Sequence, residues 1–239
     1  MKLIYDGKVV LVTGARRGVG RLIVEYFLQQ GAQVIGFSRS EESVVDQHPQ
    51  YHHFAIDVSD HQSVVHGFDT FRKNFNRLDI AINNAAVLTS QYAMIMPASA
   101  ARDMVETNLL GTFLISRESA KIMRRNKWGR IINISSMAVN LEPIGDSVYA
   151  ATKAGIISLA NVMAKEFAPF NVTCNTLGIT AIQTDMLNQL SRQKVDAVIS
   201  GLPIPRYATA NDILNVINFF ASETSSYITA QTLFLGGVS

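Results

Sequence analysis

The segment Tyr149-Ala-Ala-Thr-Lys153 places a phenol and an ammonium four residues apart. Residues with this spacing lie on one face of a helix, so both groups can point into the same cleft. A free phenol has a pKa near 10, and lowering it by about 3 units takes roughly 4 kcal/mol of preferential stabilisation of the phenolate. A nearby ammonium can supply that energy in a partly dry site. Tyr149 is therefore a candidate general acid and base, and Lys153 the cation that lowers the pKa of its phenol.

A glycine-rich turn near the N-terminus is the second candidate site. Residues 8–13 predict a short buried strand, which runs directly into Gly14-Ala-Arg-Arg-Gly18-Val-Gly20 and then into a helix with apolar periodicity. Gly14 suits a tight turn, Gly18 a close approach of the backbone to a pyrophosphate, and Gly20 close packing of helix on strand. Phosphate charge would lie at the helix N-terminus. The spacing indicates a dinucleotide site, with a plain strand-to-helix connection as the alternative.

With these motifs the chain resembles the short-chain dehydrogenases/reductases over nearly its whole length. Further matches occur in the order typical of that family: Asp57-Val58 after the third strand, Asn83-Asn84-Ala85-Ala86, Asn108, and Ser136 thirteen residues before Tyr149. The tail, residues 184–186 and 227–237, is most similar to the 3-oxoacyl-ACP reductase branch. The resemblance implies an oxidoreductase that interconverts a carbonyl compound and an alcohol.

The resemblance also implies a role for each residue of the reacting centre. Tyr149 exchanges a proton with the carbonyl oxygen of the substrate, and Lys153 also holds the nicotinamide ribose hydroxyls. Ser136 hydrogen-bonds that carbonyl oxygen and stabilises the charge that develops on it, and Ser135 takes this role if the register differs by one residue. Asn108 anchors a water that passes protons to Lys153, with a solvent-facing Asn as the alternative.

The end of the second strand, residues 36–40, determines which dinucleotide the site would take. An NAD site places Asp or Glu here to bind the ribose 2′-hydroxyl, whereas this chain has Ser38 and Arg39. Arg17 adds a guanidinium that could reach a 2′-phosphate. We therefore predict NADP(H). The alternative is that Arg17 and Arg39 are solvated surface residues, and the nearby Glu41 also argues against NADP(H). The predicted cofactor contacts are Gly14, Arg16, Arg17, Gly18, Val19, Gly20, Ser38, Arg39, Asp57, Val58, Asn84, Ala85, Ala86, Tyr149, Lys153, Ile179 and Thr184.

Two segments depart from the family pattern. Ala86 stands where a glycine usually follows Asn-Asn-Ala, and we expect a modest effect on the backbone beside the cofactor. After the sixth strand, residues 177–184 lack the usual proline and form a longer connection. This leaves open the contacts of the nicotinamide carboxamide and the pose of a substrate lid expected at about 186–206. The lid could cover an acyl chain or be an ordinary amphipathic surface helix.

Alternating strand-like and helical segments predict a doubly wound α/β fold of the Rossmann type. Such alternation implies right-handed crossovers, a parallel sheet of about seven strands, and helices on both faces. No linker or repeat divides the chain, so we expect a single domain over residues 1–239. Ligands of these sheets bind beyond the carboxyl ends of the strands, where the motifs above fall. Strands are expected near 9–13, 33–38, 52–57, 79–83, 130–135, 171–176 and 232–235.

Composition agrees with this fold and argues against several functional classes. A chain of 239 residues with 48% hydrophobic content can bury a sizeable core. The net charge of +2 gives no sign of nucleic-acid binding. No apolar run is long enough for a membrane span and no signal-peptide layout is present, so we expect a cytoplasmic protein without membrane association. The single cysteine, Cys174, suits a buried core position, and the five histidines show no metal-ligand pattern.

The favoured function is NADPH-dependent reduction of a ketone, most like that of a 3-oxoacyl thioester. A group of basic residues before the fifth strand could attract an acyl carrier protein, and a solvated helix C-terminus explains the group as well. Phe170, where carrier-dependent relatives often have a basic residue, weakens the carrier hypothesis. The basic residues are Lys121, Arg124, Arg125, Lys127 and Arg130.

Two other functions stay open. One is an NAD(P)-dependent dehydrogenase of a cyclic or secondary alcohol or a dihydrodiol. Residues 143–149 are similar to the corresponding segment of such dehydrogenases. The other is a dinucleotide sensor without chemistry, against which the intact set of Asn108, Ser136, Tyr149 and Lys153 argues. Because the family generally pairs its two long helices, here about 99–125 and 148–168, we expect a homotetramer or homodimer.

Overall fold

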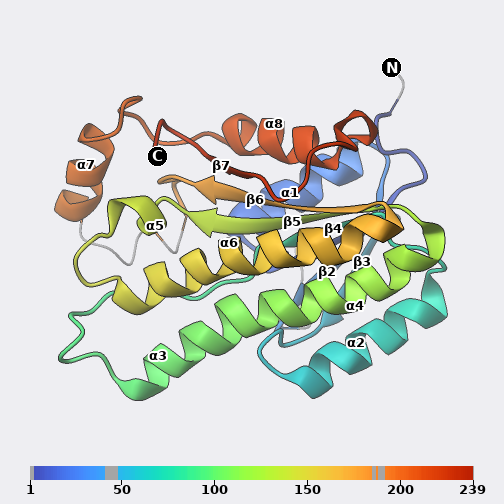
Figure 1. The fold of residues 1–239 in the computed structure, drawn as a ribbon, viewed down its shortest axis with the longest axis horizontal. Coiled ribbons are helices and arrows are strands. Elements are labelled where there is room, and N and C mark those ends of the chain that lie inside the picture. Colours follow the sequence, from blue (N-terminus) through green and yellow to red (C-terminus); the bar gives the residue numbers. More distant parts are fainter. Residues whose placement is uncertain (1–2, 41–47, 185–186, 188–191, 239) are drawn as a thin grey trace.

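A parallel sheet forms the centre of the computed structural model, with helices on both of its faces (Figure 1). Within the residues described, 3–40, 48–184, 187 and 192–238, seven strands form this sheet in the order β3-β2-β1-β4-β5-β6-β7. The predicted Rossmann-type fold is confirmed. The strands are β1 (Val9–Thr13), β2 (Gln33–Ser38), β3 (Tyr51–Ala55), β4 (Ile80–Asn83), β5 (Gly129–Ser136), β6 (Val172–Ile179) and β7 (Thr232–Phe234).

Each face of the sheet packs against its own layer of helices. One layer contains α1 (Gly18–Gln29) and α8 (Ala210–Ala221); the other contains α2 (His61–Asn74), α4 (Gly111–Asn126) and α6 (Ser147–Phe167) (Figure 1). Because side chains alternate along a strand, Val10 and Val12 of β1 face the first layer and Leu11 faces the second. The shorter elements are α3 (Ala98–Met104), α5 (Ala138–Leu141), α7 (Arg192–Ser200), η1 (Val105–Leu110), η2 (Ala168–Phe170) and η4 (Glu223–Ser225).

The expected long helix at about 99–125 is built from three consecutive elements. A π-helical segment, η1, joins α3 to α4, and Asn108 lies inside it. The Thr112 hydroxyl donates to the Asn108 carbonyl at 2.6 Å. A π-helical turn is rare and is often found at functional sites, which agrees with the position of Asn108 beside the cleft described below.

The switch in strand order between β1 and β4 places the ligand cleft. From β1 the chain moves outward to β2 and β3, and it then returns to β4 on the other side of β1. The two directions of winding leave a crevice beyond the carboxyl ends of β1 and β4. The glycine turn after β1 and the segment Asn84-Ala85-Ala86 after β4 both lie at this point.

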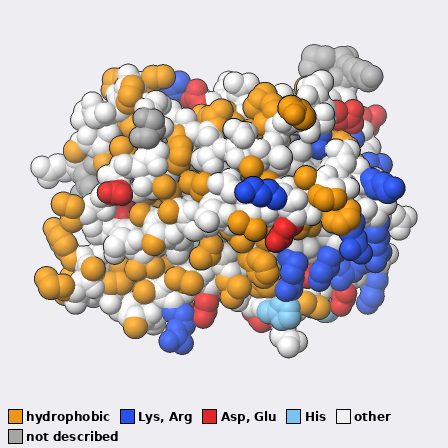
Figure 2. Space-filling view, in the orientation of Figure 1, with side chains coloured by type: hydrophobic (Ala, Val, Ile, Leu, Met, Phe, Trp, Pro, Cys, Tyr) orange, Lys and Arg blue, Asp and Glu red, His pale blue; other side chains and the backbone are white. Residues whose placement is uncertain are grey.

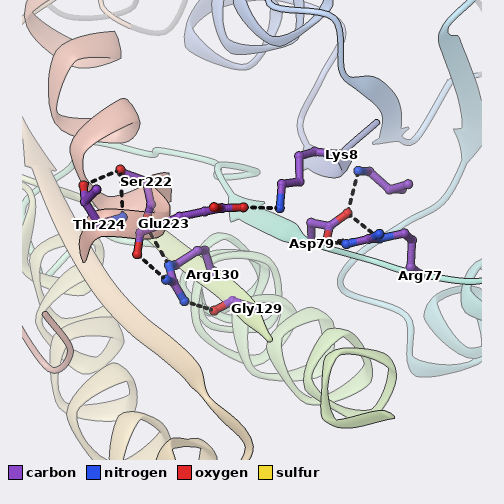
Figure 3. Close-up of polar contacts among 9 residues, drawn as sticks. Lys8, Arg77, Asp79, Gly129, Arg130, Ser222, Glu223 and Thr224 are labelled. Carbon is purple, nitrogen blue, oxygen red and sulfur yellow. Dashed lines mark hydrogen bonds and ion pairs between the residues drawn. The ribbon is translucent and has the colours of Figure 1, made fainter. Parts of the chain in front are cut away.

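Arg130 lies at the amino end of β5, away from the ligand cleft, and Figure 3 shows its contacts. Its guanidinium is fully buried and donates to the backbone carbonyls of Gly129 at 3.0 Å, Ser222 at 3.2 Å and Glu223 at 3.5 Å. It also lies 4.5 Å from the centre of the Trp128 ring. Arg130 therefore ties the chain after α8 to β5, and its inclusion in a surface group of basic residues was wrong.

The remaining basic residues of that group lie at the surface. Lys121 pairs with the buried carboxylate of Glu118 at 2.7 Å, and the Arg124 guanidinium stacks over Phe170 at 5.6 Å. Arg125 and Lys127 are exposed at the end of α4. Lysine and arginine side chains gather over this end of the molecule, at the right of Figure 2. In the described part of the chain, none of the helices has the length and apolar character needed to cross a membrane.

Candidate active site

The carboxyl ends of the central strands open into a cleft of about 480 Å³. Of the predicted cofactor contacts only Gly20 does not line this cleft. Gly20 instead packs against the Gly14 turn, as described below. Ser135, the predicted alternative to Ser136, also lines the cleft, as do Phe37, Ser40 and Ile182 from the segments 36–40 and 177–184. The cleft contains four more residues that sequence reasoning missed, because they belong to no motif. These are Ile56, Val87, Thr107 and Ile134.

The glycine turn has the backbone geometry that its spacing predicted. Gly14 and Gly18 have positive φ angles of 65° and 55°, which residues with side chains rarely adopt. A Cβ atom on Gly20 would lie 2.1 Å from the Gly14 carbonyl oxygen, so only glycine allows α1 to pack this close. Arg17, immediately before α1, makes no side-chain cap, and the first N–H groups of the helix can therefore receive an anion.

Thr13 connects the glycine turn to the end of β4. Its hydroxyl accepts hydrogen bonds from the backbone N–H groups of Asn84 and Ala85, both at 3.0 Å. The Asn84 amide in turn donates to the Thr13 carbonyl at 3.0 Å. These bonds hold both walls of the cleft in register. A threonine directly before the first glycine was the sequence signal for this role, and it was missed.

The end of β2 gathers hydrogen-bond donors at the rim of the cleft. The Arg16 guanidinium donates to the Ser40 hydroxyl, and the Ser38 hydroxyl donates to the Ser40 carbonyl at 3.3 Å. His53 of β3 supports this turn, because its Nε2 lies 2.8 Å from the Ser40 carbonyl. Arg39 is exposed beside them, and Glu41 lies outside the described residues. Guanidinium and hydroxyl groups in this arrangement suit a phosphate.

The reacting centre lies on the inner side of the cleft, where α6 crosses the end of β5. Tyr149 and Lys153 of α6 are both buried, and the Lys153 Nζ lies 5.8 Å from the centre of the Tyr149 ring. The same Nζ donates to the Ile134 carbonyl at 2.8 Å. Ser136, at the end of β5, lies close enough to the Tyr149 phenol to lower the pKa of that group. Three of the four predicted catalytic side chains, Ser136, Tyr149 and Lys153, therefore meet at one place.

The expectation that Lys153 lowers the pKa of the phenol was wrong for this arrangement. Burial raises the pKa of Tyr149 to about 12, the nearby Asp146 carboxylate acts in the same direction, and only the nearby Ser136 hydroxyl opposes them. Burial also lowers the pKa of Lys153 to about 8. The ammonium donates to the Ile134 carbonyl rather than to the phenol, so removal of water dominates the pKa of both groups.

The two adjacent serines at the end of β5 have different partners. Ser135 donates from its hydroxyl to the Lys153 carbonyl at 2.9 Å. Ser136 accepts at its hydroxyl from the Ala138 N–H at 3.1 Å and lies close to Tyr149. Because the Ser135 hydroxyl is committed to the helix backbone, Ser136 is the better candidate for the hydroxyl that contacts a substrate.

Asn108 is fully buried, so the alternative of a solvent-facing side chain was wrong. Its amide oxygen accepts from the Val87 N–H at 2.8 Å, and its amide nitrogen donates to the Val87 carbonyl at 3.0 Å and to the Thr152 hydroxyl at 3.2 Å. The side chain thus fixes the loop after β4 against α6. The water relay suggested for Asn108 stays a prediction.

A model of the short chain dehydrogenase family matches residues 8–195. The chain belongs to the short-chain dehydrogenases. Curated relatives support this over nearly the full length. The chain is 33% identical over 237 residues to the 3-oxoacyl-[acyl-carrier-protein] reductase FabG of Salmonella typhimurium, covering 98% of this chain and 97% of the relative. It is 34% identical to FabG of Escherichia coli with the same coverage.

Solved structures of similar fold agree with the assignment. A protein described as a gluconate dehydrogenase from Agrobacterium tumefaciens superposes with a TM-score of 0.92 at 25% identity, covering 99% of this chain and 97% of its own. The structure of ElxO with NADP bound superposes with a TM-score of 0.88 at 27% identity, covering 96% and 97% of the two chains.

This short-chain dehydrogenase has a second cavity, of about 110 Å³, next to the reacting centre. Tyr149 lines both cavities, whereas Ser136 lines only the second. The region predicted as a lid contributes Leu187 and two residues of α7, Val195 and Val198. Residues 186 and 188–191 of that region lie outside the described residues. The other lining residues are Leu88, Met137, Ala138, Leu141, Pro143, Asp146, Ile179, Thr180, Ala181, Ile182 and Thr184.

Proposed function

We propose that this short-chain dehydrogenase reduces a ketone to a secondary alcohol with NADPH. The observation that carries the proposal is that the buried phenol of Tyr149 lines both cavities, with Lys153 beside it in the larger one and Ser136 in the smaller one. NADPH bound in the larger cavity supplies the hydride. A ketone in the smaller cavity places its oxygen between the hydroxyls of Ser136 and Tyr149. The phenol then gives its proton to that oxygen and the alcohol results.

The preference for NADPH over NADH rests on the rim at the end of β2. Arg16, Arg39 and the Ser38 and Ser40 hydroxyls offer donors to a 2′-phosphate. Among the solved structures of similar fold, ElxO holds NADP. An anionic phosphate gains more from this set of donors than the neutral hydroxyl of NADH does.

A 3-oxoacyl thioester is the first candidate for the substrate, because the FabG relatives are named for that activity. Arg125 and Lys127 are the exposed cations available to an acidic carrier protein. We also propose association of copies through the long helices, as a homotetramer or homodimer. Val105, Leu110 and Val162 expose apolar side chains there.

A second candidate substrate is a cyclic or hydroxylated ketone, with the corresponding diol in the reverse direction. It is favoured by Asp146, a carboxylate that lines the smaller cavity. A plain acyl chain offers this carboxylate no hydrogen-bond donor.

The test is NADPH and NADH oxidation with a 3-oxoacyl thioester, presented on acyl carrier protein and on a small thiol. We expect turnover that prefers NADPH and falls about 10²- to 10⁴-fold in Tyr149→Phe, because the proton donor is lost. Lys73→Ala, on the exposed surface of α2, serves as the control. Faster turnover on the carrier than on the thiol would support the basic surface at the end of α4.

Two results would contradict this proposal. Tight NADPH binding without turnover of thioesters, cyclic ketones or hydroxyketones would support a dinucleotide sensor instead. Equal activity of Tyr149→Phe and the wild-type protein would show that the phenol is not the proton donor.

A further inference from the structure

Asp146 is a buried carboxylate beside the reacting centre for which the proposed reaction has no role. It is 4% exposed, stands immediately before α6 and lines the smaller cavity. Its charge lies near enough to the Tyr149 phenol to raise the pKa of that group. Ser90, from the loop after β4, donates its hydroxyl to the Asp146 carboxylate.

Helix capping does not account for this side chain. An Asp before a helix usually accepts from the N–H groups of the first turn, but the Asp146 side chain makes no such bond to α6. Its backbone carbonyl accepts the ordinary helical bond from the Ala150 N–H at 2.7 Å. The carboxylate is therefore turned away from the helix axis, toward Ser90 and the cavity.

Backbone bonds also join the two loops around the cavity. The Gln91 N–H donates to the Gly145 carbonyl at 2.8 Å, which joins the loop after β4 to the loop before α6 by a backbone bond. The Asp146 N–H donates to the Pro143 carbonyl at 3.1 Å and closes the turn before the helix. A neutral or apolar side chain at position 146 would leave both bonds in place.

The surroundings determine what the carboxylate can bind. The nearby walls of the cavity are mostly apolar, with Leu88, Leu141 and Pro143 among them. An apolar pocket orients its ligand through a few polar groups, and Ser136 and Tyr149 are already committed to the carbonyl oxygen. An ionised carboxylate only accepts hydrogen bonds. Methylene groups packed against it would offer it no hydrogen bond, whereas an O–H group of a substrate could donate one.

We propose that Asp146 is a specificity residue that accepts a hydrogen bond from a hydroxyl group close to the reacting carbonyl of the substrate. The class of substrate is then a hydroxyketone, and a vicinal diol in the reverse direction. A hydroxyl fits better than an ammonium, because stripping water from a cation costs far more than from a neutral group. The inference rests on the proposed ketone reduction and does not depend on a thioester substrate.

The experiment compares pairs of ketones that differ by one hydroxyl: 2-hydroxycyclohexanone with cyclohexanone, and 3-hydroxybutan-2-one with butan-2-one. For the wild-type protein with NADPH, kcat/KM should be at least about 10-fold higher for the hydroxylated member of each pair. In Asp146→Ala this ratio should fall to about 1, because the acceptor is gone. Asp146→Asn keeps the size and one acceptor oxygen, and its ratio should lie between these values.

The ratio separates recognition from a structural role, since the plain ketone reports any general damage to the site. Equal losses for both members in Asp146→Ala, with the ratio unchanged, would overturn the inference. A wild-type kcat/KM ratio near 1 between the hydroxylated and the plain ketone would overturn the inference as well. This measurement needs no variant, so the inference can be tested even if Asp146→Ala does not fold. NADPH binding with turnover of neither member would instead overturn the proposed ketone reduction, and the inference with it.

Discussion

The Ser135 hydroxyl donates to the backbone carbonyl of Lys153 at 2.9 Å, which fastens the end of β5 to the middle of α6. The next residue, Ser136, lies close to Tyr149, which belongs to the same helix. The two hydroxyls meet different turns of α6, so that of Ser135 holds the helix while that of Ser136 is left for chemistry. Strand and helix together set the distance between the proton donor and the substrate cavity.

Replacement of each serine separates these two roles. Ser136→Ala should lower kcat/KM about 10²- to 10³-fold with little change in melting temperature, because it removes a donor to the reacting oxygen. Ser135→Ala should lower the free energy of unfolding by about 1 kcal/mol and reduce activity much less. Urea unfolding and steady-state kinetics on both variants measure the difference. The assignment fails if the two variants lose activity equally.

The buried ammonium of Lys153 should make stability depend on pH. Burial lowers its pKa from 10.5 to about 8, so the folded protein releases this proton at a lower pH than the unfolded chain does. The unfolded chain then binds more protons between these values, and stability rises with pH over this window. Relative to Lys153→Met, the wild-type protein should gain about 1 kcal/mol between pH 8 and pH 9.

Urea unfolding of both proteins at pH 7, 8 and 9 measures that gain. The comparison cancels other groups, such as Tyr149 and Cys174, whose pKa values burial raises. A difference between the two proteins that stays constant over the range would place the pKa of Lys153 outside this window.

The rim at the end of β2 should control the choice between the two dinucleotides. Arg39→Ala and Arg16→Ala should each weaken NADPH binding by about 10-fold or more and leave NADH binding nearly unchanged, because each removes a charged donor to the 2′-phosphate. Fluorescence titration with both dinucleotides gives the two dissociation constants. Lys73→Ala, outside the cleft, is the control. Parallel weakening of NADH and NADPH would argue against this role.

Gly20→Ala should disrupt the dinucleotide site through the backbone alone. The added Cβ would lie 2.1 Å from the Gly14 carbonyl oxygen and 2.6 Å from the Asn84 amide nitrogen, so α1 must shift away from the turn. We expect a loss of about 1–3 kcal/mol in stability together with most of the NADPH affinity. Gly201→Ala is the matched control, since its nearest neighbour is the Val198 carbonyl oxygen at 3.5 Å. Unchanged NADPH affinity in Gly20→Ala would contradict the geometry.

The sequence by itself predicted the order of strands and helices, the glycine turn and the members of the reacting centre. These features depend on neighbours in the chain: the period of apolar residues defines each element, and the spacing of Tyr149 and Lys153 defines a helix face. The carboxyl ends of parallel strands meet at one edge of a sheet, so residues that follow different strands could be assigned to one cleft.

Only the tertiary structure decided features that depend on what surrounds a side chain. The direction of the Tyr149 and Lys153 pKa shifts follows from burial, which no spacing reveals. Arg130 looked like a surface cation in the sequence, but its guanidinium lies inside the protein on carbonyls from residues 222 and 223. Nothing in the sequence singled out Asp146, yet the meeting of two distant loops leaves its carboxylate at the substrate cavity. Burial and contact are set by segments far apart in the chain, and so they appear only when the chain is folded.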